Sequence, residues 1–304
     1  MVQPDNHIQT PPVRESYALK DGNLSAVHFG RRANPLKLVL LHANGFNAMS
    51  YRQVLEPLGV HALAIDLRGH GLSTLPADPD TLSTWRTFRD DIIDFFDRYI
   101  EHPVVLAGHS FGAVSGLLTS RALGNKMSGY VGFDPVIVPQ PFRAIAASNW
   151  GRKIMKKRLP IAAKAGRRRA EFESAQAALA NYKGRGVFKN MHESVIKDYL
   201  DGGLIKTRFG VKLACDPLWE QAVFCAQNHN AIKASRHLPP LSKIIFAGKN
   251  SPTPFSVQAR MTARFGRKNV HSSGKFAHLF PLHDPAFAAR VLEDMLKAVS
   301  LQQH

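Results

Sequence analysis

Cysteine and long apolar runs are both scarce in this sequence. The two cysteines, Cys215 and Cys225, lack the spacing of a metal site, and two thiols are too few for a disulfide framework. No apolar run approaches the roughly 20 residues of a membrane-spanning helix. The polar, proline-bearing stretch MVQPDNHIQTPPVRES also lacks the apolar centre of a signal peptide. We therefore expect a cytoplasmic protein with no membrane span.

Acidic residues are also few, since 23 Asp and Glu stand against 40 Lys and Arg, a formal net charge of +17. Nine of these cations fall in one run, Arg152 to Arg169. Three interpretations of the run stay open: a solvated helix face, a docking surface for a carboxylate or phosphate of the substrate, or contact with a membrane surface or nucleic acid. Because no nucleic-acid motif or interleaved aromatic residues accompany the charge, we expect no nucleic-acid partner.

Short apolar strands alternate with helical patterns along most of the chain. The apolar patterns predict a hairpin over 16–29, turning at Asp21-Gly22, and strands over 37–42, 61–66, 103–108, 130–134 and 244–248. Apolar residues at helical spacing predict helices over 49–58, 84–100, from 110 onward and over 285–301. This alternation is typical of βαβ units. The predicted fold class is therefore α/β, with a mostly parallel central sheet flanked by helices.

The interval from 138 to 238 interrupts this alternation. It carries helical patterns and basic runs but no convincing buried strand. We interpret it as a helical cap inserted between two strands of one sheet, so that residues 16–137 and 239–304 together form the core. Residues 1–15 are expected to be a flexible N-terminal tail.

The stretch VVLAGHSFGAVSG, residues 104–116, places a serine between two glycines where a strand is expected to pass into a helix. A strand, Gly-x-Ser-x-Gly and a helix in succession are the context of a nucleophile elbow. In this sharp turn the glycines allow backbones to pass where side chains would clash, and the hydroxyl is displayed beside a helix N-terminus that stabilises negative charge. Ser110 is therefore the candidate nucleophile.

Three further stretches accompany the elbow: LVLLHANGF at 38–46, DLRGHGLS at 66–73 and KFAHLFPLHDP at 275–285. Together with GHSFGA they resemble the α/β-hydrolase fold superfamily, in its order and over most of the chain outside the predicted cap. The resemblance implies a catalytic serine, acid and histidine in that chain order, and an oxyanion hole of two backbone N–H groups. It implies no metal and no organic cofactor. A serine at position 110 also disfavours the dehalogenases and epoxide hydrolases of this fold, which use an aspartate.

The resemblance also indicates the oxyanion donors. Phe111, the residue after the nucleophile, would supply one N–H group. The other would come from the loop after the strand over 37–42, where Asn44 is the choice by position. Because HANGF is longer than the commoner His-Gly turn, Gly45 and Phe46 stay open as alternatives. Loss of one such donor typically lowers the rate by about 10²–10³.

Fourteen histidines compete for the role of general base. His278 is the prediction, because it occupies the family's position in a loop before the last helix and has apolar neighbours that exclude water. His283 is the nearest alternative. His42 is expected to shape the oxyanion loop, and His70 and His109 are expected to be structural.

The acid is the point where this chain departs from the family pattern. Many relatives carry an aspartate after the strand that corresponds to 244–248, but here the loop reads AGKNSPTP, with Asn250 and Ser251 and no carboxylate. Some α/β-hydrolases place their acid after the preceding strand, where this chain has Asp134. Two interpretations of Asp134 stay open: the acid that orients the histidine, or a cap on the turn before Pro135.

The expected function is a serine hydrolase that cleaves a carboxylic ester, thioester or related acyl bond of a small-molecule substrate. If the basic run docks the substrate, that substrate is anionic. Apolar cap residues, among them Trp150, Phe172, Trp219 and Phe224, would line an acyl pocket if some of them face the elbow. Two alternatives stay open. The fold also hosts cofactor-free C–C bond hydrolases and lyases with the same residue types. The asparagine at 250 also leaves open a catalytically weak, hydrolase-like binding protein.

Overall fold

The computed structural model describes residues 11–302, and its centre is an eight-stranded sheet in the order β1-β2-β4-β3-β5-β6-β10-β11. The neighbouring pairs from β4 to β11 are parallel, whereas β2 runs antiparallel to both β1 and β4. The prediction of a mostly parallel α/β sheet is therefore confirmed. The strands are β1 (Val13–Leu19), β2 (Gly22–Phe29), β3 (Leu38–Leu41), β4 (Ala62–Asp66), β5 (Val104–His109), β6 (Met127–Phe133), β10 (Ser242–Phe246) and β11 (Val270–Ser272).

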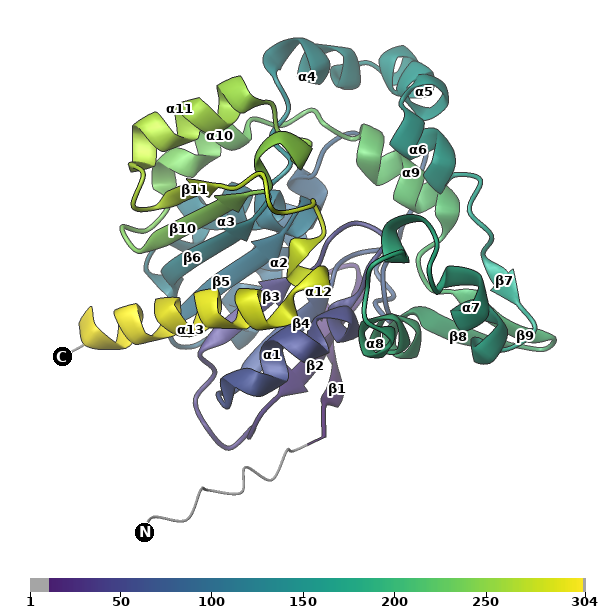
Figure 1. Cartoon of the computed structure of the whole chain (residues 1–304), viewed down its shortest axis with the longest axis horizontal. Coiled ribbons are helices and arrows are strands. Elements are labelled where there is room, and N and C mark those ends of the chain that lie inside the picture. The colour runs from purple at the N-terminus through teal and green to yellow at the C-terminus, as the bar shows by residue number, and fades with distance from the viewer. Residues whose placement is uncertain (1–10, 303–304) are drawn as a thin grey trace.

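Both faces of the sheet are covered, which explains the continuous apolar runs of its central strands. In β3, Leu38 and Leu40 join one apolar cluster and Val39 and Leu41 join the other, because successive side chains point to opposite faces. Figure 1 shows α13 running across the sheet. Two helices cover the face of Leu38, namely α1 (Arg52–Leu55) and α13 (Pro285–Gln302). Three cover the opposite face, namely α2 (Arg86–Tyr99), α3 (Phe111–Leu123) and α11 (Phe255–Phe265).

Two predicted elements differ in the structure. The helix expected over 49–58 is divided, because one 3₁₀ turn, Ala48–Tyr51, precedes α1 and a second, Glu56–Leu58, follows it. The second turn contains Pro57, which lacks the N–H group needed to continue an α-helix. The sequence also gave no prediction of α11 or β11; β11 is only three residues long, and only Val270 in it is buried.

The segment 138–238 is mostly helical, but it also contains a small three-stranded antiparallel sheet that the sequence did not predict. Its strands lie at the surface, so they have no apolar run that would reveal them. Figure 1 shows these elements gathered on one side of the large sheet, except α10, which lies beside α11. They are α4 (Gln140–Ala147), α5 (Asn149–Arg158), α6 (Pro160–Ala165), β7 (Glu171–Phe172), α7 (Ala175–Tyr182), α8 (Glu193–Gly203), β8 (Leu204–Thr207), β9 (Gly210–Leu213), α9 (Pro217–Cys225) and α10 (Ala231–Ala234).

The limits of the predicted domains meet the structure at two places. β1 begins at Val13, inside the tail expected over 1–15, and residues 1–10 of that tail lie outside the described residues. At the other limit, α10 packs against α3, where Ser120 Oγ donates to the carbonyl of Ala234 at 3.1 Å. The last part of the predicted cap segment therefore packs with the core. No helix within residues 11–302 is long and apolar enough to cross a membrane.

Candidate active site

The serine between the two glycines stands at the junction of β5 and α3, in a strained backbone conformation. Ser110 has φ 57° and ψ −113°, a region that non-glycine residues rarely adopt. Its glycine neighbours are required by space: a Cβ on Gly112 would lie 2.3 Å from the carbonyl oxygen of Leu41, and one on Gly108 would lie 2.6 Å from Ala113. The local structure is therefore the elbow that the sequence motif predicts.

Three segments bring their side chains together at this elbow. Ser110 Oγ lies 2.9 Å from Nε2 of His278, in the loop before α12 (Phe280–His283). On the other side of the ring, His278 Nδ1 lies 2.7 Å from Oδ2 of Asp134, at the end of β6. In this arrangement the imidazole can take the serine proton at Nε2 while the carboxylate holds the proton at Nδ1.

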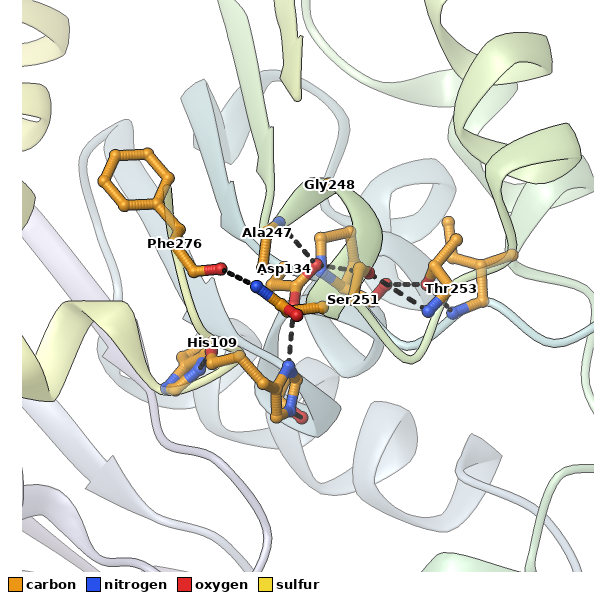
Figure 2. A network of polar contacts seen from close by, with 12 residues as sticks. His109, Asp134, Ala247, Gly248, Ser251, Thr253 and Phe276 are labelled. Carbon is orange, nitrogen blue, oxygen red and sulfur yellow. Dashed lines mark hydrogen bonds and ion pairs between the residues drawn. The ribbon is translucent and has the colours of Figure 1, made fainter. Parts of the chain in front are cut away.

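The position of Asp134 is fixed by contacts to the loop after β10. Its Oδ1 accepts from Ser251 Oγ at 2.6 Å and from the N–H of Ala247 at 3.2 Å, which leaves Oδ2 for His278. The residue is fully buried and has φ 43°, so it too is held in a conformation that favours glycine. Figure 2 shows this carboxylate between Ala247 and Ser251.

Asn250 and Ser251, which occupy the place where relatives carry the acid, contribute differently. Asn250 Nδ2 donates to the carbonyl of Phe276 at 3.0 Å, so this residue holds the loop that carries His278. Ser251 donates to Asp134 instead of approaching the ring. Asn250 therefore supports the loop of His278 and Ser251 supports Asp134, and neither side chain takes the place of a carboxylate.

A buried chain of hydrogen bonds joins the loop of His278 to the loop after β3. The carbonyl of His278 can only accept, so His109 donates its Nε2–H to it at 2.9 Å, and His109 Nδ1 accepts from the hydroxyl of Tyr51 at 2.7 Å. That hydroxyl in turn accepts from the N–H of Ala43 at 3.1 Å. His109 therefore has the structural role expected of it, while Tyr51, a lone aromatic in a short helical turn, gave no sequence signal.

The loop after β3 offers three candidate N–H donors for an oxyanion, and two of them are engaged. The N–H of Phe46 donates to the carbonyl of Ala43 at 3.1 Å, and that of Gly45 donates to His70 Nε2 at 3.2 Å. No hydrogen bond within residues 11–302 uses the N–H of Asn44 or of Phe111, the first residue of α3. The geometry favours Asn44 among the three alternatives.

The cap segment holds this loop in place. Asn44 Nδ2 donates at 3.0 Å to the carbonyl of Glu220 in α9, which is 176 residues further along the chain. The Glu220 carboxylate pairs with Arg168 at 2.7 Å, and the guanidinium also contacts the hydroxyls of Tyr182 and Tyr199. Sequence analysis missed Glu220, because no pattern links residues so far apart. Arg168, one of the nine cations of the basic run, is thus already paired inside the protein.

The chain matches one known protein family over most of its length. A model of the alpha/beta hydrolase family matches residues 38–291, a stretch that includes Asn44, the elbow, Asp134 and His278. The chain belongs to the alpha/beta hydrolase family. A search of the curated proteins finds no match.

Solved structures with the same fold as this hydrolase include several enzymes. E-2-(acetamidomethylene)succinate hydrolase has a TM-score of 0.72 at 17% identity, over 94% of this chain and 100% of its own. The thioesterase domain from the curacin biosynthetic pathway has a TM-score of 0.71 at 13% identity, over 93% and 99% of the two chains. A thermophilic esterase from Thermogutta terrifontis has a TM-score of 0.63 at 17% identity, over 95% and 99%. At this identity the likeness establishes a common fold.

The aromatic residues that were expected to line an acyl pocket have different surroundings in the hydrolase. Trp150 is 74% exposed on α5, because Gly151 and Met155 occupy the buried side of that helix, so the prediction for Trp150 is wrong. Trp219 is buried and donates to the carbonyl of Arg68 at 3.0 Å. The other two pack within the cap segment. Phe172 contacts Tyr182, and Phe224 packs against a small apolar cluster.

The described residues contain no metal-binding cluster, and among them the alternative base makes no hydrogen bond to Ser110 Oγ. Within residues 11–302, no three His, Cys, Asp or Glu side chains come together in a way that could hold a metal ion. His283, the alternative base, lies at the end of α12, and its buried Nε2 has no hydrogen-bond partner among the described residues. Ser110 contacts His278 and not His283.

Buried histidines of the hydrolase predict that its stability falls in mild acid. Burial lowers the pKa of His42 to about 4 and the pKa values of His70, His109 and His229 to about 3. In the unfolded chain these groups titrate near 6.5, so below that pH the unfolded chain binds protons that the folded chain does not. The histidines therefore stabilise the fold above pH 6.5, and this stabilisation is lost as the pH falls toward about 4.

Urea unfolding followed by circular dichroism measures the effect. Between about pH 7.5 and about pH 5 we expect the free energy of unfolding to fall by about 2 kcal/mol for each of these histidines. The matched variant His42→Gln removes one of the four groups, so its free energy of unfolding should change less between the same two pH values. An unfolding free energy that is equal at both pH values contradicts the prediction.

Proposed function

We propose that this protein is a serine hydrolase that cleaves a carboxylic ester, a thioester or a related acyl bond through an acyl-enzyme. The observation that carries the proposal is the continuous contact from Ser110 Oγ through the imidazole of His278 to the carboxylate of Asp134, at 2.9 and 2.7 Å. The family and the elbow backbone support it. In the proposal Asp134, and not a residue of the loop at Asn250, is the acid.

The first half of the reaction forms the acyl-enzyme. Ser110 Oγ attacks the substrate carbonyl carbon while its proton passes to His278 Nε2. Asp134 Oδ2 stabilises the imidazolium that forms and keeps the ring in the orientation that the transfer needs. The negative charge on the carbonyl oxygen is held by the N–H groups of Asn44 and Phe111. The tetrahedral intermediate then collapses, and the leaving oxygen or sulfur takes the proton from Nε2.

The second half releases the acid. A water molecule gives its proton to His278 Nε2 and attacks the acyl carbon, and the same two N–H groups hold the second oxyanion. Collapse returns the proton to Ser110 Oγ and frees the carboxylic acid. The support of His109 and Tyr51 keeps the His278 loop and the Asn44 loop in register through both halves.

The experiment that tests the proposal is hydrolysis of p-nitrophenyl esters from acetate to dodecanoate, with fluorophosphonate labelling of the same preparation. We expect saturable hydrolysis, an optimum chain length that measures the acyl pocket, and one labelled peptide, which contains Ser110. Labelling should be lost when the protein is unfolded in urea, since the reactivity of this serine depends on its folded neighbours. Folded protein that neither hydrolyses an ester of the series nor reacts with the fluorophosphonate contradicts the proposal.

The contacts of Asp134 also bear on the alternative of a catalytically weak binding protein. That alternative rests on the absence of a carboxylate at Asn250. The buried carboxylate of Asp134 contacts His278 from the end of the neighbouring strand, and this contact favours the hydrolase over the binding protein.

A further inference from the structure

The first three cap helices form a surface with an unusual charge. Residues 140–169 contain ten Lys and Arg and no Asp or Glu. Within the described residues two of the ten are paired, Lys156 with Asp80 and Arg168 with Glu220. The other eight have no carboxylate of residues 11–302 within ion-pair distance. Their charge is therefore available to an anionic partner. We call the exposed part of α4, α5 and α6 the cap surface.

Large apolar side chains stand among these cations. Trp150 is 74% exposed, and Ile145 in α4 and Ile161 in α6 are 50% and 51% exposed. In α5, Trp150, Lys153 and Lys157 follow one another at i, i+3 and i+7, so they share one face of the helix. A tryptophan with two lysines beside it on a solvent face is an amphipathic arrangement that a purely solvated helix does not need.

The same pairing recurs on α6, and the helices are placed to act together. Ile161 and Lys164 are one helical turn apart and both are exposed. Figure 1 shows α4, α5 and α6 in succession along the rim of the molecule, on the side opposite β1 and β2. The large apolar side chains on these helices stay exposed within residues 11–302, so this rim is available to a large partner.

A small cavity lies beside the exposed face of α5. It measures about 270 Å³, and α5 lines it with cationic and amide side chains. The rest of its lining is Pro79, Leu82, Ala222, Cys225 and one carboxylate, Asp80, which Lys156 already neutralises. A lipid headgroup phosphate is the kind of anion that such a lining would accept, since Arg and Lys are its usual partners. The α5 residues that line it are Asn149, Arg152, Lys153 and Lys156.

We propose that the cap surface docks the protein on a membrane that contains anionic lipid. Cations near a membrane surface are attracted by its negative potential, while tryptophan and isoleucine enter the boundary between headgroups and acyl chains. Nucleic acid fits less well, because exposed Ile145 and Ile161 gain nothing from a phosphate backbone and would be left facing water. The proposal concerns a surface outside the elbow and does not depend on the reaction proposed there.

Vesicle binding tests the proposal with the whole chain. Co-sedimentation is measured with vesicles of phosphatidylcholine alone and of phosphatidylcholine mixed with phosphatidylglycerol. We expect binding to the mixed vesicles only, weakening as salt is raised, because ions screen the attraction. Equal binding to both kinds of vesicle, or binding to neither, overturns the proposal. Binding to RNA without binding to the mixed vesicles overturns it as well.

The variants locate the interaction. Lys153→Gln/Lys157→Gln/Arg158→Gln removes three exposed charges of α5 and keeps long side chains that suit a helix. We expect its partition onto mixed vesicles to fall about 100-fold. The matched control neutralises three exposed arginines elsewhere, in Arg31→Gln/Arg121→Gln/Arg267→Gln. If the control loses as much binding as the α5 variant, the attraction belongs to the overall charge and the proposal is wrong.

Tryptophan emission reports the docked residue directly. The chain has three tryptophans, and the two besides Trp150, namely Trp85 and Trp219, are each only 2% exposed. A blue shift on adding mixed vesicles therefore reports Trp150 entering the membrane interface. We expect the shift in the wild type and in the arginine control, and no shift in Trp150→Phe, which should still bind. Binding of the wild type without any shift contradicts the placement of Trp150 in the interface.

Discussion

Ser110→Ala is expected to lower kcat for the best p-nitrophenyl ester by about 10⁶-fold, with the protein still folded. The hydroxyl at the elbow forms the covalent bond of the proposed reaction, and among the residues that the structure describes no second nucleophile contacts His278 Nε2. What remains would come from the oxyanion donors and substrate binding. The measurement is steady-state kinetics on the wild type and the variant, with fluorophosphonate labelling of both.

A serine five residues further along the chain provides the control for this variant. Ser115 is buried in α3, and its hydroxyl donates to the carbonyl of Phe111 at 3.0 Å. Ser115→Ala therefore makes the same chemical change in the helix that follows Ser110, and we expect its kcat to stay within about tenfold of the wild type, since it removes one neutral hydrogen bond. If Ser110→Ala hydrolyses the ester as fast as Ser115→Ala, Ser110 is not the nucleophile.

Asp134→Asn is expected to lower kcat by about 10⁴-fold, with little change in the overall fold. The reason lies in the two donors that hold this side chain. Ser251 Oγ–H and the N–H of Ala247 both point at Oδ1, so an amide here keeps its oxygen toward them and turns its NH₂ toward His278. The Nδ1 atom must then accept, the ring proton moves to Nε2, and Nε2 can no longer take the proton of Ser110.

Asn250 provides the control for the acid. It occupies the place of the acid in many relatives, yet its side chain donates to the carbonyl of Phe276 and does not contact the ring of His278. Asn250→Ala should therefore lower kcat by no more than about tenfold, through a less well-held loop. If instead Asn250→Ala loses more activity than Asp134→Asn, the residue that orients His278 lies in the loop after β10 and the assignment to Asp134 is wrong.

The sequence by itself determined the features that depend on neighbouring residues. The apolar runs and helical spacing predicted the mostly parallel sheet, because strands buried on both faces are continuously apolar and the helices that cover them repeat apolar residues at helical spacing. Gly-x-Ser-x-Gly predicted the elbow because the requirement for these residues is also local. The space around Gly108 and Gly112 admits no Cβ, so this local geometry requires these residue types. The density of cations over Arg152 to Arg169 was equally visible.

The tertiary structure decided what depends on residues far apart in the chain. Asp134 could be an acid or a turn cap on sequence grounds, and only the pairing of β6 beside β10 brings its carboxylate to His278. Asn44 is favoured over Gly45 because His70 occupies the N–H of Gly45, a contact that no spacing predicts. The cap gave the least signal: its strands have no buried run to mark them, and Trp150 faces water because the other side of α5 is packed. A periodic pattern records which side of an element is buried, but not which distant side chains meet there.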